Sequence, residues 1–116
     1  MKPKVLVIVE SDPRSSGRPA EAIRVAAGVG TWKKAEIHLH LRGAAILTLG
    51  EWVDDLMDED NFTRYLPIVR ESGGPITVEA GSPFLTDLGE STTPHTPITA
   101  DQLAVLAAHS SSVLRF

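Results

Sequence analysis

Apolar and polar residues follow one another along the chain in blocks that predict strands and helices in turn. Residues 4–9 (KVLVIV) form an almost unbroken apolar run, and a polar loop follows over residues 10–17. A strand that is apolar at nearly every position has both faces buried, as in the middle of a parallel sheet covered by helices on each side. Small apolar residues then predict a helix over about residues 18–29. Pro19 suits its first turn, and two glycines suit its end.

The second predicted strand covers residues 35–41 and alternates strictly between apolar and polar positions. This alternation indicates a strand with one wetter face. The wetter face consists of Glu36, His38 and His40. Residues 44–49 (AAILTL) are short and apolar, so periodicity fits either a strand or a helix there. We favour a short strand or an extended segment.

Two amphipathic helices are predicted in the middle of the chain. Residues 51–57 place apolar side chains at helical spacing, and a second apolar stripe begins at Asn61. Pro67 lies inside this second stripe and should kink or interrupt the helix. The acidic residues of 54–60 lack the oxygen spacing and the glycine of a calcium loop, so we interpret them as a solvated helix face.

The last third of the chain combines two strands, a long loop and a helix. Residues 75–79 (PITVE) predict a strand, and residues 80–98 predict a loop rich in Gly, Ser, Thr and Pro. Loops of this length in compact domains are usually functional or disordered. A capping box at Thr99 and Gln102 opens a short helix, and residues 112–116 predict a final strand.

The order of these elements is that of an α/β protein. Strands that alternate with helices build a mostly parallel sheet with right-handed crossovers. We therefore predict one domain over residues 1–116, a three-layer α/β/α sandwich with a mostly parallel five-stranded sheet. The length of 116 residues and the 42% hydrophobic and 22% charged content fit one globular domain.

Charge and hydropathy exclude several classes of partner. A formal net charge of −4 argues against a dedicated nucleic-acid binder, which needs clustered Lys and Arg. No apolar run approaches the ~20 residues that span a bilayer. The beginning of the chain lacks the pattern of a secretory signal. We expect a cytoplasmic protein with neither nucleic acid nor membrane as its partner.

The sequence contains no cysteine. Disulfides, thiolate metal ligands, cysteine nucleophiles and persulfide chemistry are therefore excluded for this chain.

Five segments of the chain together resemble the DsrE-type family of small sulfur-relay proteins. These segments are KVLVIV, PAEAIRVAAGV, EIHLHLRGAAILTL, PITVEAGSPFLTDLG and ITADQLAVLAAHSSSVLRF. The resemblance covers nearly the whole chain as an order of elements. It implies a five-stranded parallel sheet between helices and assembly into homo-oligomers, either trimers or hexamers.

The same resemblance implies where the family's chemistry would reside. In members that transfer sulfur, a cysteine just after the equivalent of residues 75–79 carries a persulfide. Here the segment reads Glu79-Ala80-Gly81-Ser82-Pro83. Serine cannot replace the cysteine, because a hydroxyl is protonated near neutral pH and forms no exchangeable S–S bond. The family's catalysis therefore does not carry over.

Polar residues cluster in sequence just after the predicted strands. Ligands of open parallel sheets bind beyond the carboxyl ends of the strands. The candidates for such a binding site are Glu10, Ser11 and Asp12 after the first strand, Arg42 after the second, and Glu79, Gly81 and Ser82 after the later one. The alternative interpretation is that these residues only form the turns that end the strands.

Two loops offer further candidates. The segment from Arg14 to Arg18 precedes a helix N-terminus, where an anion is favoured, although it matches no phosphate-loop glycine pattern. A flexible polar loop is the alternative interpretation. His95 is an imidazole on the long loop. It would form a hydrolase-type site with Ser82 as nucleophile and Glu79 or Asp87 as orienting carboxylate, although no G-x-S-x-G turn is present.

His38 and His40 share a strand face with Glu36 and have the spacing of two metal ligands, but no third ligand is evident. We expect these histidines to be packed under a helix or at a subunit contact.

The sequence thus predicts a non-catalytic DsrE-like domain without a cofactor or resident metal. We expect an oligomeric scaffold or ligand-binding subunit that takes a small anionic ligand or a partner protein. The candidate binding residues are Glu10, Ser11, Arg14, Arg42, Glu79, Gly81, Ser82 and His95. The alternative is the small hydrolase that uses Ser82 and His95.

Overall fold

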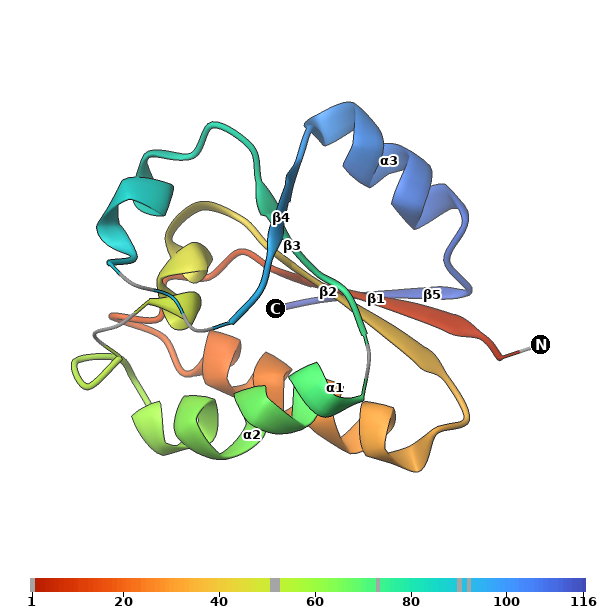
Figure 1. Cartoon of the computed structure of the whole chain (residues 1–116), viewed down its shortest axis with the longest axis horizontal. Helices are drawn as coiled ribbons and strands as arrows, with labels where there is room; N and C mark the ends of the chain where they lie inside the picture. The colour runs from red at the N-terminus through yellow and green to blue at the C-terminus, as the bar shows by residue number, and fades with distance from the viewer. Residues whose placement is uncertain (1, 51–52, 73, 90, 92) are drawn as a thin grey trace.

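A five-stranded sheet in the order β4-β3-β2-β1-β5 forms the centre of the molecule (Figure 1). The computed structural model describes residues 2–50, 53–72, 74–89, 91 and 93–116. All four strand pairings are parallel, which confirms the predicted α/β class. The strands are β1 (Lys4–Val9), β2 (Glu36–Leu41), β3 (Ile76–Glu79), β4 (Thr96–Ile98) and β5 (Ser112–Arg115). The helices are α1 (Arg18–Trp32), α2 (Glu59–Glu71) and α3 (Ala100–Ala108), with two 3₁₀ helices, η1 (Gly43–Leu49) and η2 (Pro83–Asp87).

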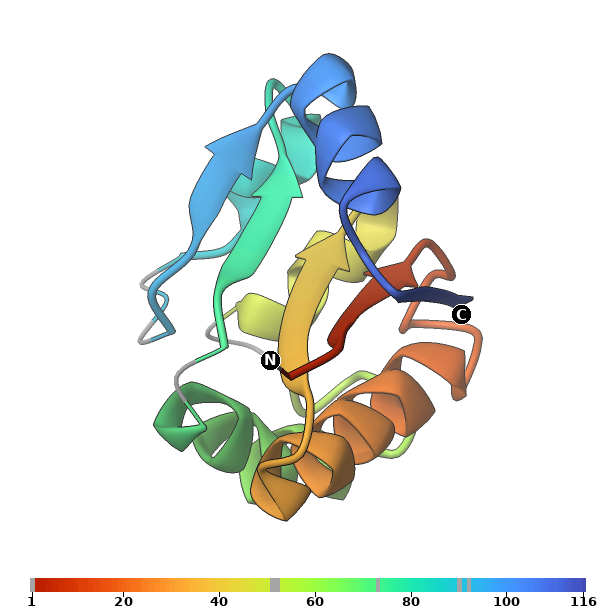
Figure 2. The same cartoon turned by 90° about the vertical axis from the view of Figure 1, so that its right-hand side faces the viewer.

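Helices α1 and α2 cover one face of the sheet, and α3 lies on the other (Figures 1 and 2). The main core lies beneath α1 and α2. There Val7, Leu39 and Leu41 are fully buried against small residues of α1, among them Ala20 and Ala26. Small side chains let the helix approach the sheet closely. Gly74 serves a similar purpose between α2 and β3, since a Cβ there would lie 2.4 Å from the carbonyl oxygen of Ile37.

The register of the strands determines which side chains lie on the face of the sheet that α3 covers. Leu6 pairs with His38, and Ile8 pairs with His40. Parallel neighbours in register point to the same side of a sheet, so the two histidines lie beside apolar residues on this face. Helix α3 itself contains no buried residue.

Residues 43–49 form the 3₁₀ helix η1, so the short strand that we expected there was wrong. Gly43 has a φ of +53°, which turns the chain out of the direction of β2 immediately after Arg42. The tight turn then buries Ala45, Ile46 and Leu49 on one side. A short apolar run with one buried side fits a helix as well as a strand, so the local sequence pattern could not distinguish between the two.

The helix expected over residues 51–57 was also wrong for the part that the structure describes. Residues 51 and 52 lie outside the described residues, and residues 53–58 form turns. The Met57 N–H donates to the Pro13 carbonyl at 2.8 Å, and Asp58 adopts a left-handed φ of 55°. Helix α2 begins only after this break, at Glu59.

Of the two effects that we expected from Pro67, a kink or an interruption, the interruption was wrong, because α2 continues through Pro67 to Glu71. Proline removes one backbone hydrogen bond, but Phe62, Leu66 and Val69 are buried against the core and hold the helix on both sides of it. Helix α1 also ends later than expected, at Trp32, where Lys33 supplies a left-handed cap.

Strand β4 lies inside the predicted loop of residues 80–98 and was missed. It contains Pro97, which cannot donate to a neighbouring strand, and it forms the edge of the sheet beside β3. An edge strand tolerates proline because one side of its backbone needs no partner. The remaining loop is further shortened by η2.

Within the described ranges, no helix is both long enough and apolar enough to cross a membrane.

Candidate functional site

Three charged side chains converge where β1, β2 and β3 end. An Arg42 Nη1 lies 3.3 Å from Glu10 Oε1, and its Nη2 lies 4.0 Å from Glu79 Oε2. The Gly43 N–H donates to Glu79 Oε1 at 3.2 Å. Arg115, at the end of β5, approaches the same Glu10 oxygen at 3.0 Å. The structure therefore brings together Glu10, Arg42 and Glu79, three residues that the sequence placed at this edge.

This charged cluster lines an open hollow of about 300 Å³ bounded by Glu10, Arg42, Gly43 and Glu79. The Arg42, Glu79 and Glu10 side chains remain 38%, 40% and 45% exposed. Ion pairs this exposed contribute only about 0–1 kcal/mol each to stability. Their main consequence is to hold the Arg42 guanidinium at the mouth of the hollow.

Arg14 lies at the same edge but is engaged by its own loop. Its Nη2 lies 2.8 Å from Asp12 Oδ2, and its guanidinium lies 5.7 Å from the centre of the Phe84 ring in η2. The hydrogen bond from Arg14 lowers the pKa of Asp12. Arg14 therefore joins the loop after β1 to η2.

The other candidates at this edge have local structural roles. The buried Ser82 caps η2, because its Oγ accepts from the Phe84 N–H at 3.3 Å. Gly81 supplies a φ of +77°, which a side chain would strain. The Ser11 N–H donates to the Phe116 carbonyl at 3.3 Å. The turn interpretation describes Gly81 and Ser82, whereas the hydrogen bond of Ser11 joins the end of β1 to the end of the chain after β5.

The structure does not bring Ser82 and His95 together. Ser82 follows the carboxyl end of β3, whereas His95 precedes β4, and Thr96 of β4 pairs with Thr77 near the amino end of β3. A strand advances about 3.3 Å per residue, so much of β3 lies between the two side chains. His95 instead lines a second hollow of about 530 Å³ with Arg70 and Pro75, and its Nδ1 contacts the Thr93 carbonyl at 2.8 Å.

His38 and His40 share one hydroxyl on the α3 face of the sheet. His38 Nε2 lies 3.0 Å from Thr77 Oγ1, and His40 Nδ1 lies 2.8 Å from the same oxygen. Burial lowers the pKa of His38. Burial also lowers the pKa of His40 to about 4, with Arg42 and His38 acting in the same direction and Glu79 opposing them. Both rings are therefore neutral near pH 7.

His40 was not among the predicted site residues, although it lies next to Arg42 in space as well as in sequence. It lines a small cavity of about 120 Å³ together with Arg42, Glu79 and the first residues of α3. The alternation of residues 35–41 placed it on the polar face. Only the register of β2 with β3, which pairs His40 with Thr77, reveals its partner.

No group of three or more His, Asp or Glu side chains in the described ranges is arranged to hold a metal ion. Glu36 is exposed at the beginning of β2, whereas His40 is buried near its other end. Of the acidic residues that we interpreted as a solvated helix face, Asp54, Asp55, Asp58 and Asp60 are exposed, but the first three precede α2. Glu59, the first residue of α2, is half-buried, and its Oε2 is buried without a hydrogen-bond partner among the described residues.

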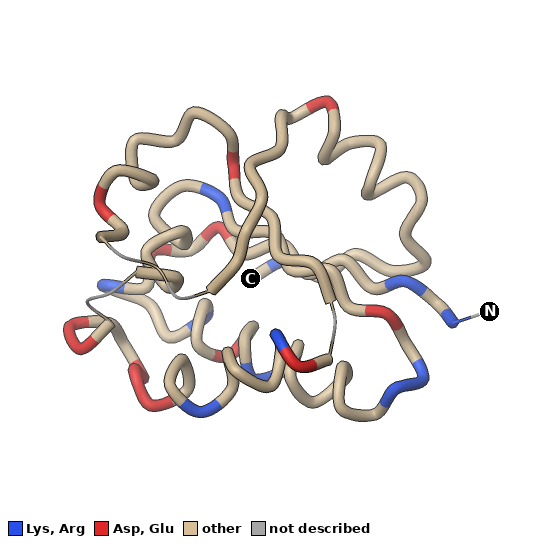
Figure 3. The backbone as a smooth tube through the Cα atoms, viewed as in Figure 1, with Lys and Arg blue, Asp and Glu red and all other residues tan. Residues whose placement is uncertain are grey.

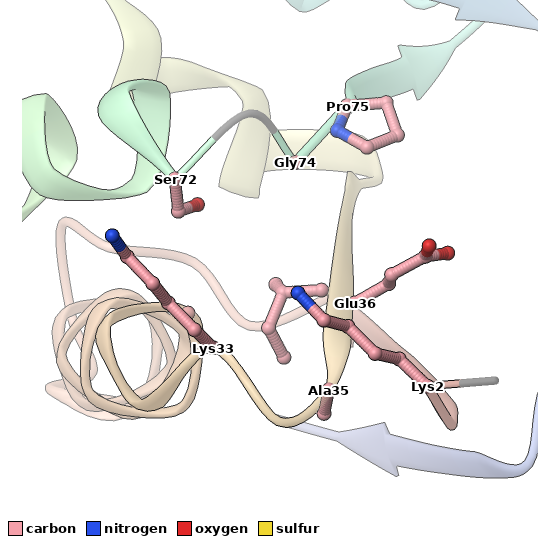
Figure 4. Close-up of a pocket in the computed structure, with 9 residues that line it drawn as sticks. Lys2, Lys33, Ala35, Glu36, Ser72, Gly74 and Pro75 are labelled. Carbon is pink, nitrogen blue, oxygen red and sulfur yellow. The ribbon is translucent and has the colours of Figure 1, made fainter.

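The opposite edge of the sheet has a hollow of about 390 Å³ between the ends of α1 and α2 (Figure 4). Lys33 reaches toward Ser72 there, and Lys2 and Glu36 also line it. These three charged side chains are all exposed, and the hollow has no buried polar side chain. The carboxyl edge, where a buried histidine meets Arg42 and Glu79, is therefore the better candidate site.

Charge is distributed unevenly over the surface (Figure 3). The α3 layer is nearly uncharged, since Asp101 is the single charged residue of that helix. Val105 of α3 is 59% exposed, and Val113 and Leu114 of β5 are also exposed.

The parallel sheet, its covering helices and its polar carboxyl edge define a small α/β domain of the DsrE-like fold. The crystal structure of the ychN protein from E. coli is similar to it, with a TM-score of 0.76 and 20% sequence identity over 100% of both chains. No protein-family model and no curated protein matches the chain. At this level of identity, the similarity to ychN concerns the fold alone.

Proposed function

We propose that this protein is a non-catalytic, cytoplasmic subunit of a homo-oligomer that binds a small anionic ligand at the carboxyl edge of its sheet. The observation that carries this proposal is the position of Arg42, which two carboxylates hold beside a hollow of about 300 Å³. A guanidinium fixed in this way recognises carboxylates and phosphates with defined geometry.

The absence of catalysis rests on two observations. The chain has no cysteine, so it cannot carry a persulfide in the manner that the DsrE-type resemblance implies. The serine and histidine that would replace it lie toward opposite ends of β3, beyond hydrogen-bond reach of each other.

The oligomer is supported by the α3 layer. A helix that covers a sheet normally buries one stripe of side chains, whereas the stripe of α3, formed by Leu103, Leu106 and Ala107, is only half-buried. Its outer surface combines an almost complete lack of charge with an exposed Val105, and the edge strand β5 next in the chain exposes Val113 and Leu114. A second copy of the chain packed here would bury these side chains.

Sedimentation velocity at micromolar concentration should give the mass of a trimer or hexamer. Val105→Lys should shift the protein toward the monomer, because it places an ammonium group in an apolar contact. Met57→Lys is the matched control, since Met57 is also exposed but precedes α2 and lies away from α3. A wild-type protein that sediments as a clean monomer would contradict the assembly.

Ligand binding should depend on Arg42. In calorimetric titrations with phosphate, sulfate, acetate and citrate, at least one anion should bind, and Arg42→Gln should weaken it about tenfold or more, as expected for a charged hydrogen bond of about 1.5–3 kcal/mol. Arg24→Gln is the control, because Arg24 is an exposed arginine of α1 that pairs with Glu21. Equal binding by both variants, or no binding of any of these anions, would contradict the proposed site.

A further inference from the structure

A cavity of about 120 Å³ lies between the carboxyl ends of β2 and β3 and the first turn of α3. His40, Arg42, Glu79, Ile98, Thr99 and Ala100 line it. One water occupies about 30 Å³ in the liquid, so a cavity of about 120 Å³ has room for a group of a few heavy atoms. Arg42 and Glu79 also line the open hollow of the proposed site, so the two spaces are neighbours.

His40 provides a buried polar atom at this cavity. Its side chain belongs to a residue only 1% exposed, and its Nδ1 is held by Thr77 Oγ1. Its Nε2 has no hydrogen-bond partner in the described part of the chain. A neutral imidazole whose Nδ1 accepts a hydrogen bond carries its proton on Nε2, and it then donates to whatever occupies the cavity.

The Thr77 hydroxyl determines whether His40 can be this donor. Thr77 has one hydrogen to give and two ring nitrogens within reach, at 2.8 Å on His40 and 3.0 Å on His38. If it donates to His40 Nδ1, it accepts from His38 Nε2–H, and all three groups are satisfied. An acceptor in the cavity therefore favours the tautomer of His40 that is protonated on Nε2.

The first turn of α3 adds further donors. Its capping box uses the Gln102 N–H, which donates to Thr99 Oγ1 at 3.2 Å, and the Leu103 N–H donates to the Thr99 carbonyl. The Ala100 and Asp101 N–H groups precede the first intrahelical bond, and neither donates to any residue that the structure describes. Of the two residues, Ala100 lines the cavity. Exposed amides and the helix dipole both favour an anion at this position.

Glu79 restricts which anion fits. Its Oε1 accepts from the Gly43 N–H, and its Oε2 lies 4.0 Å from Arg42. A carboxylate repels a fully deprotonated anion, but it accepts a hydrogen bond from an anion that keeps a hydroxyl group. Hydrogen phosphate has such a hydroxyl near neutral pH, whereas sulfate has none.

We propose that this cavity binds a hydrogen-phosphate group, with the His40 Nε2–H, the Ala100 amide and Arg42 as donors and Glu79 as the acceptor of the phosphate hydroxyl. This proposal rests on the proposed anion-binding function. It names the class of anion, and it adds the small cavity to the open hollow as part of the binding site. Two sources supply a phosphate group that keeps a hydroxyl: inorganic phosphate, and a phosphomonoester below its second pKa of about 6, whose remaining atoms would extend into the open hollow.

Nuclear magnetic resonance on ¹⁵N-labelled protein at about pH 5.5, where inorganic phosphate and methyl phosphate both keep a hydroxyl, tests this binding directly. Inorganic phosphate should shift the amide signals of Ala100 and Asp101, and it should move the His40 ring nitrogens to the pattern of the Nε2–H tautomer. Phosphate should bind at least tenfold more tightly than sulfate. Methyl phosphate distinguishes the two sources: tighter binding than inorganic phosphate assigns the site to phosphomonoesters, and weaker binding assigns it to the free ion.

Three variants locate the phosphate. Ala100→Pro removes one donor amide and suits both the first position of a helix and the extended backbone of Thr99 before it, with φ −79° and ψ 167°. His40→Phe removes the ring donor, and each variant should weaken phosphate binding about tenfold. Glu79→Gln should abolish the preference for phosphate over sulfate. His109→Phe, at the exposed end of α3, is the control and should bind as the wild type does.

The outcomes separate this inference from the proposed function. Binding that is lost in Arg42→Gln but unchanged in both Ala100→Pro and His40→Phe would place the anion in the open hollow, which overturns the cavity proposal and leaves the proposed function intact. Equal affinity for sulfate and phosphate would overturn the role of Glu79 and with it the hydrogen-phosphate proposal. No response to any of the four anions tested above would overturn both.

Discussion

Thr77→Val should lower the free energy of unfolding by about 2–4 kcal/mol, since each buried polar group left without a partner costs about 1–3 kcal/mol. Valine has nearly the shape of threonine, so the change removes the hydroxyl and leaves the packing of β3 in place. The rings of both His38 and His40 then lose the one hydrogen bond that each makes within the described part of the chain. His40 is affected most, because it is 1% exposed and water does not readily replace Thr77. Urea unfolding followed by circular dichroism measures the difference.

Thr48→Val is the matched control for this prediction. Thr48 is also a buried threonine, but its Oγ1 has no hydrogen-bond partner among the residues that the structure describes. Replacing it with valine removes an unsatisfied polar atom and should raise the stability by about 1 kcal/mol. The opposite signs of the two changes are the essential result. Equal effects of the two substitutions would show that Thr77 does not hold the histidine pair.

Acidification should destabilise the protein between pH 6.5 and about 4, and His40 should account for up to about 3 kcal/mol of the loss, at about 1.4 kcal/mol per pKa unit. The His40 pKa is near 6.5 in the unfolded chain and is lowered to about 4 in the folded one. In this window the unfolded chain binds more protons, so the free energy of unfolding falls as the pH falls. Above pH 6.5 the contribution is complete, and His38 adds to the loss in the same direction.

The difference between two stability curves isolates this effect from other titrations. The groups that act on His40 are Arg42 and His38, which disfavour its protonation, and Glu79, which favours it. His40→Phe should flatten the curve between pH 6.5 and 4, whereas His109→Gln, at an exposed position, should keep the slope of the wild type. Parallel curves for wild type and His40→Phe would contradict the burial of a neutral His40.

These two predictions concern a cluster that the sequence indicated only in part. Alternation over residues 35–41 placed His38 and His40 on one face of a strand, because side chains alternate with a period of two. It did not identify Thr77, because the pairing of β2 with β3 joins residues 37 positions apart. A contact of this kind follows from strand register, which no local pattern records.

The charged edge was predictable for a more general reason. Parallel strands of one sheet end at the same edge, so the residues that follow them must be neighbours. Glu10, Arg42 and Glu79 meet for this reason. The same rule does not apply to His95, which precedes a strand that the sequence did not reveal and so lies toward the other end of the sheet. The missed strand β4 is short and contains Pro97, so its composition is that of a loop.

The sequence by itself determined the α/β class, the buried first strand, the capping box of α3 and the absence of thiol chemistry, because periodicity, local hydrogen bonding and composition are properties of neighbouring residues. Tertiary structure alone decided that residues 43–49 are helical, that Ser82 and His95 are apart, and that His40 faces the first turn of α3. Each of these depends on how distant segments pack against one another. Packing over such distances is set by the whole chain and is not encoded in any one segment of it.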